Sequence, residues 1–137
     1  MARSRKNRNV VRGSAEWNST LNKLIEKASR HRCVADASVG ISVMWLESLL
    51  CMYDVSLVGQ SRIKRKWVES SASARGLYKT IRPIWVTFDY TDCTDNIRRR
   101  ITVFGRDAAV ASQMIDTLGG KSIERFHKQS SDKLLRL

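Results

Sequence analysis

The chain has few acidic residues, no long apolar run and no apolar segment after its basic start, and each shortage argues against a class of protein. Its 137 residues contain 13 Asp and Glu against 25 Lys and Arg, which gives a net charge of +12 and predicts a polyanionic partner. No apolar stretch reaches the ~18 residues that a spanning helix needs. The basic start leads into polar residues rather than into an apolar signal segment. We therefore expect a soluble, unsecreted, intracellular protein, either cytoplasmic or nuclear.

Cysteines are scarce, odd in number and widely spaced, at Cys33, Cys51 and Cys93. This spacing fits neither a disulfide framework nor a paired-cysteine metal site, so reduced thiols are the simplest interpretation. A zinc site built from His31, Cys33, Cys93 and His127 is the alternative. Structural zinc ligands usually come in close pairs, however, and the chain offers only one such pair. No metal site is predicted.

Catalytic patterns are missing as well. The two histidines lie far apart, the carboxylates are scattered singly, and no glycine-rich loop follows a strand as in nucleotide-binding sites. Asp89, Asp92 and Asp95 lie close together and could hold a divalent cation, but aspartates in a turn usually bond to their own backbone. We therefore predict no enzyme, no catalytic residue and no cofactor.

Hydrophobic residues make up 42% of the chain, which is enough for one core at this length. Residues 1–13 carry basic side chains without an acidic one and show no periodicity. They are predicted to be a flexible basic arm ahead of a single domain at 14–137. Ser14 can cap a helix over 15–31, where apolar residues follow the helical period.

The most apolar part of the chain, 36–58, is ambiguous. Its residues 39–45 alternate between apolar and small or polar types, as a strand would. From Ser42 onward, helical spacing produces an apolar stripe that is too wide for a surface helix. We favour a largely buried helix over 42–54.

The clearest unit is a β-hairpin. Apolar and polar residues alternate over 84–90 and again over 97–103, and a turn cluster lies between them. The only proline, Pro83, comes at the start of the first strand, where a missing N–H is tolerated. The small, polar segment 70–76 is predicted to be a loop.

A further helix is predicted over 106–118, with Asp107 as its cap and Gly119 as its stop. It should pack on the hairpin, and the remaining residues 121–137 form an amphipathic, basic terminal segment. The order of elements predicts an α+β fold with N-terminal helices, an antiparallel sheet, and a C-terminal helix packed on that sheet.

Basic side chains gather in three places: the arm, the segment after Gly59, and the second hairpin strand. On that strand, Arg98 and Arg100 should share a solvent face opposite Arg99. The middle cluster can be explained without a ligand if the aliphatic parts of its solvated Lys and Arg side chains cover an apolar seam. Four cations within five residues repel one another, however, and this favours a bound counter-anion. The candidate nucleic-acid-binding residues are Arg3, Arg5, Lys6, Arg8, Arg12, Arg62, Lys64, Arg65, Lys66, Trp67, Arg98, Arg99 and Arg100.

This charge distribution predicts a protein that binds nucleic acid, with RNA favoured, through the phosphate backbone and without a base-reading motif. A subunit of a larger ribonucleoprotein would carry the same arm. The alternative is a structural protein on an anionic membrane surface, where each Lys or Arg contributes about 1 kcal/mol. Exposed strands and an apolar C-terminus also make a homo-oligomer plausible.

One resemblance favours the second alternative. The run WLESLLCMYDVSLVG with the basic residues after it, the strand ITVF, and the run AVASQMIDTLGGKSIERFHK together resemble the order of elements in small rhabdovirus-type matrix proteins. The resemblance implies a basic, non-enzymatic virion protein that bridges a ribonucleoprotein and a membrane and self-associates. It assigns no individual functional residue.

Overall fold

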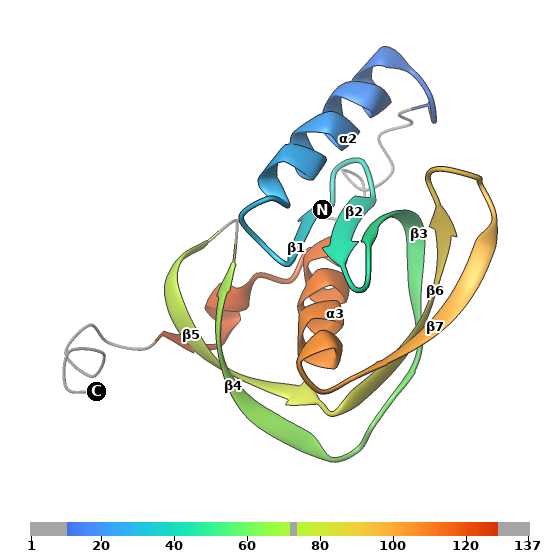
Figure 1. Ribbon diagram of the computed structural model, residues 1–137. Helices are drawn as coiled ribbons and strands as arrows, with labels where there is room; N and C mark the ends of the chain where they lie inside the picture. The colour runs from blue at the N-terminus through green and yellow to red at the C-terminus, as the bar shows by residue number, and fades with distance from the viewer. Residues whose placement is uncertain (1–10, 72–73, 129–137) are drawn as a thin grey trace.

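The computed structural model of the chain describes residues 11–71 and 74–128, and Figure 1 shows their arrangement. In chain order the elements are α2 (Ala15–Lys27), β1 (Cys33–Asp36), β2 (Ile41–Trp45), β3 (Leu49–Gln60), β4 (Lys64–Ser71), β5 (Ala74–Pro83), β6 (Trp85–Asp92), β7 (Arg98–Phe104), α3 (Gly105–Leu118), the 3-10 helix η1 (Ile123–Arg125) and β8 (His127–Lys128). Every strand pair in these ranges is antiparallel, which confirms the predicted α+β class.

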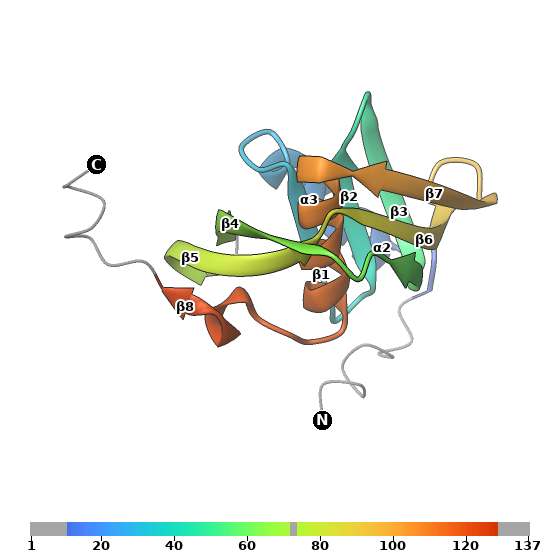
Figure 2. The same ribbon diagram turned by 90° about the horizontal axis from the view of Figure 1, so that it is seen from below.

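Two sheets curve around α3. The larger sheet has the strand order β1-β2-β3-β6-β7, and the smaller has the order β4-β5-β8. Figures 1 and 2 show α3 within the curve of the two sheets, while α2 covers β1 and β2 from the other side. Residues of α3 such as Ala108, Ala111 and Met114 pack with Phe88 and Val103 in the main core. The predicted packing of this helix on the hairpin is confirmed.

Helix α2 begins as the sequence predicts. The Ser14 hydroxyl accepts a hydrogen bond from the backbone N–H of Trp17 at 3.2 Å, and Trp17 itself is buried. The helix ends at Lys27, four residues before the predicted end at His31. The chain then turns toward β1, and the carbonyl of Arg32 accepts a hydrogen bond from the N–H of Trp45 at 2.8 Å.

The helix predicted over 42–54 is wrong: the segment forms most of β2 and the first half of β3. Ile41 and Val43 pack under α2, whereas Met44 and Met52 pack under α3. A strand that is covered on both faces has no polar face, so it is easily mistaken for a buried helix. The alternation over 39–45 was the correct indication.

The hairpin at 84–104 is confirmed as β6 and β7, joined by the predicted turn. The loop predicted over 70–76 is wrong. Strands β4 and β5 pair with each other almost up to the residues that the structure leaves undescribed, with Ser71 opposite Ala74. Pro83 closes β5 rather than opening β6. Most of the segment that we expected to be a loop therefore belongs to these two strands.

The chain crosses between the two sheets at one corner, where Ser61 fixes both connections. This serine is 6% exposed, and its Oγ accepts a hydrogen bond from the N–H of Ile84 at 2.8 Å while donating to the carbonyl of Ile63 at 2.7 Å. The end of β3 and the start of β6 are thereby held together.

Most of the predicted basic arm and the end of the terminal segment, at 1–10 and 129–137, lie outside the described residues. Within the described part, η1 and β8 continue the terminal segment, and β8 pairs with β5. No helix in that part is both long enough and apolar enough to cross a membrane.

Candidate binding pocket

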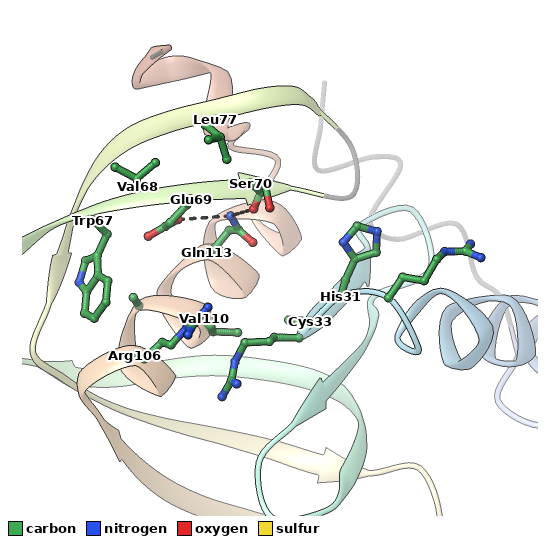
Figure 3. Close-up of a pocket in the computed structure, with 13 residues that line it drawn as sticks. His31, Cys33, Trp67, Val68, Glu69, Ser70, Leu77, Arg106, Val110 and Gln113 are labelled. Carbon is green, nitrogen blue, oxygen red and sulfur yellow. Dashed lines mark hydrogen bonds between the residues drawn. The ribbon is translucent and has the colours of Figure 1, made fainter. Parts of the chain in front are cut away.

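A pocket of about 430 Å³ lies between α3, β4 and the segment that leads into β1. Figure 3 shows its walls, with β4 on one side, His31 and Cys33 on the other, and α3 between them. The residues that line it are Arg30, His31, Arg32, Cys33, Trp67, Val68, Glu69, Ser70, Leu77, Arg106, Ala109, Val110 and Gln113.

The β4 wall is the edge of a sheet. In the described part of the chain, β4 pairs with β5 on one side only. Four consecutive residues, 67–70, line the pocket, although successive side chains of a strand point to opposite faces. A cavity can touch four in a row when it meets the strand along its edge. The pocket therefore lies beside the backbone groups of β4 that β5 does not use.

The α3 wall is one face of the helix. Arg106, Ala109, Val110 and Gln113 follow the i, i+3, i+4, i+7 spacing that places side chains on a common stripe. The Gln113 amide donates to the carbonyl of Ser70 at 3.0 Å. This bond ties α3 to β4, so the two walls of the pocket are held at a fixed separation.

A buried arginine supports the β4 wall from behind. Arg82 of β5 is 1% exposed, and its guanidinium donates to both carboxylate oxygens of Glu69 at 3.0–3.3 Å. Its Nη1 also donates to Asp116 of α3 at 2.7 Å, and Phe126 lies under the guanidinium at 4.9 Å. Because Glu69 also accepts hydrogen bonds from Thr80 and Gln113, its charge is fully engaged.

The thiol in the pocket is not an activated nucleophile. Burial raises the pKa of Cys33 to about 12, because the thiolate is poorly solvated at this position. All three cysteines are free thiols, and burial raises the pKa values of Cys51 and Cys93 as well.

The middle basic cluster lies at the start of β4. Arg62, Lys64, Arg65 and Lys66 are all exposed, and none of them forms an ion pair with another described residue. The Arg65 guanidinium stacks on the half-buried Trp67 ring at 5.1 Å. Of the predicted site residues, Trp67 alone lines the pocket.

The hairpin arginines are paired within the protein. Arg100 meets Asp89 at 2.8 Å, and Arg99 meets Asp95 at 2.6 Å and Asp92 at 3.3 Å. Arg98 meets Asp54 at 3.5 Å and also bonds to Ser56 and Thr91. As predicted for turn aspartates, Asp92 and Asp95 also accept hydrogen bonds from backbone N–H groups of the turn.

The other predicted site residues do not join these groups. Arg12 lies over the Tyr53 ring at 5.7 Å, and the remaining arm residues Arg3, Arg5, Lys6 and Arg8 lie outside the described part. Trp45 is 41% exposed and donates its indole N–H to the carbonyl of Ala28 at 2.7 Å.

No protein family model and no curated protein sequence matches this chain. Among solved structures, it is similar to a peptide deformylase from Synechococcus elongatus in complex with actinonin, at TM-score 0.74 and 18% identity over 93% of this chain and 73% of that one. The fold is that of peptide deformylases. A peptide deformylase from Plasmodium falciparum has TM-score 0.73 and 20% identity over 93% and 81% of the two chains. One from Ehrlichia chaffeensis has 0.72 and 21% over 90% and 80%.

This likeness contradicts the functional predictions. The neighbours are enzymes of one kind, so the fold gives no support to a nucleic-acid-binding protein, a matrix protein or a protein without enzymatic character. RNA and membrane partners, homo-oligomerisation and the virion setting lose their basis in the same way. The error has a physical cause: net charge reports on solubility and association, not on fold, and three of the counted arginines are already neutralised by nearby aspartates.

Peptide deformylases are metalloenzymes, and a metal ion in this pocket would require suitable ligands. Catalytic metal sites of this kind take three side chains from His, Cys and carboxylates, often with two histidines one turn apart on a helix. Helix α3 contains no His, Cys or Glu, and the described residues include no group of three that could hold a metal ion. Its two aspartates, Asp107 and Asp116, are held by arginines. The residues present do not fit a resident metal.

Sequence reasoning missed the residues that build the pocket. Gln113 and Glu69 are 44 positions apart, and nothing in the helical pattern distinguishes Gln113 from any other polar residue of α3. The one available signal was Glu69 itself. It is the only carboxylate close to the four cations of the middle basic cluster, and it follows Arg65 and Trp67 at every second position of the strand.

Proposed function

We propose that the pocket binds an extended peptide segment along the edge of β4. The observation that carries this proposal is the run of four consecutive strand residues, 67–70, beside the cavity. An extended peptide can use such an edge by pairing with its backbone, and the wall residues then select its side chains. The peptide-deformylase fold supports the same class of ligand.

The walls suit a peptide rather than a planar cofactor or a nucleotide. Val68, Leu77 and Val110 provide apolar surface, and Gln113 holds the β4 edge in place. The indole N–H of Trp67 has no hydrogen-bond partner in the described structure. An unsatisfied donor at a pocket wall is costly, and a peptide carbonyl reached by a small rotation of the ring would satisfy it.

The test uses an acetylated, amidated hexapeptide that contains valines, with binding followed by chemical-shift changes in the full chain. We expect shifts at 67–70 and 109–113. Val110→Phe fills the cavity and should weaken binding at least about tenfold. Val58→Phe is the matched control, because Val58 is 45% exposed on β3 and does not line the pocket.

Leu77→Phe narrows the pocket from β5 and provides a second test if the Val110 variant does not fold. Equal affinity in the wall variants and the Val58 control, or shifts confined to other strands, would overturn the proposal.

A further inference from the structure

The charges around the pocket are unbalanced. Of the lining residues that carry a permanent charge, Glu69 is the only acid, and Arg82, Thr80 and Gln113 all donate to it. Arg32 is paired with Asp107 at 2.6 Å. The remaining permanent charges in the lining therefore come from Arg30 and Arg106, and both are cationic.

These two arginines are available to a ligand. Both are exposed, and neither forms an ion pair with another described residue. They approach the pocket from different elements, Arg30 from the segment after α2 and Arg106 from the first turn of α3. The N-terminal end of α3 adds the positive end of its dipole to the same wall.

We infer that the peptide bound in this pocket is acidic, with a carboxylate recognised by Arg30 and Arg106 beside an apolar residue on the Val68 and Val110 walls. This inference rests on the proposed peptide binding and specifies the class of peptide. A guanidinium matches a carboxylate by a two-pronged hydrogen bond, and a lysine-bearing peptide would meet repulsion at the same place.

The experiment compares three hexapeptides of the same backbone at near-physiological salt. One has two glutamates and a free terminal carboxylate, one has two glutamines and an amide, and one has two lysines and an amide. We expect the acidic peptide to bind about tenfold more tightly than the neutral one, and the basic peptide to bind most weakly. Titration calorimetry or fluorescence of the full chain gives the three affinities.

A charge-matched pair of variants separates pocket recognition from the net charge of +12. The double variant Arg30→Gln and Arg106→Gln should remove most of the preference for the acidic peptide. The control, Arg62→Gln with Lys64→Gln, also removes two exposed cations but leaves the pocket intact, so it should keep the preference within about twofold. All four residues are exposed, and the variants are expected to fold.

Each outcome decides between the two proposals. If none of the three peptides binds, the proposed peptide binding fails. If the acidic and neutral peptides bind equally well, peptide binding stands and the inference about charge is overturned. The inference is also overturned if both double variants lose the preference for the acidic peptide equally. It is overturned as well if inorganic phosphate displaces the acidic peptide, but not the neutral one, to the same extent from the control variant and from the pocket variant.

Discussion

The arginines of this protein form two groups that differ in what surrounds them. On β7, each of Arg98, Arg99 and Arg100 has an aspartate within 3.5 Å. Around the pocket, Arg30 and Arg106 have no such partner among the described residues. A run of three arginines attracts attention in a sequence, whereas two that are 76 positions apart do not. The comparison shows that the available charge depends on the counter-ions the fold supplies and not on the density of arginines along the chain.

Arg82 sharpens this comparison, because it is paired like the hairpin arginines but is buried. Replacing it with Met would leave Glu69 without its cation and Asp116 with Arg125 alone, so we expect Arg82→Met to lower the free energy of unfolding by about 3–5 kcal/mol. Urea denaturation measures the loss. The matched control is Arg98→Met, whose side chain is 42% exposed and whose replacement should cost far less.

The origin of the Arg82 effect can be checked in a second variant. Adding Glu69→Gln and Asp116→Asn to Arg82→Met removes the two carboxylates that lose the Arg82 cation, so part of the lost stability should return. Equal losses for Arg82→Met and Arg98→Met would show that the buried network contributes no more than a surface pair.

The sequence predicted those parts of the fold whose two faces differ. The hairpin at 84–104 has Val86, Phe88 and Tyr90 on the buried face, so its alternation was visible. Strand β2 and the first half of β3 pack toward both α2 and α3, and apolar residues on both faces made this segment resemble a buried helix. The pocket could not be predicted because its walls depend on long-range contacts such as that between Gln113 and Ser70, 43 positions apart. No local pattern encodes that pairing.

The hairpin arginines provide the next test. Changing Arg98, Arg99 and Arg100 together to Ala should lower the thermal midpoint only slightly, because exposed ion pairs contribute little to stability. The affinity for an acidic peptide should not change, since none of the three lines the pocket. Calorimetry of folding and the peptide titration give both numbers. Loss of the folded state would show a structural role, and loss of peptide affinity would move the anion-binding surface to β7.

The smallest expected effect is the response of the hairpin to acid. The Arg99 guanidinium and then the Ile97 N–H lower the pKa of Asp95 to about 2, and Arg100 lowers the pKa of Asp89. A carboxylate whose pKa is depressed in the folded state stabilises that state above its unfolded pKa of about 4 and loses this contribution as the pH falls through its folded pKa. The thermal midpoints of the wild-type chain and of Asp89→Asn with Asp95→Asn should therefore differ at pH above about 4 and converge toward pH of about 2. A difference that persists unchanged into acid would mean that the two aspartates stabilise the turn through their hydrogen bonds and not through their charge.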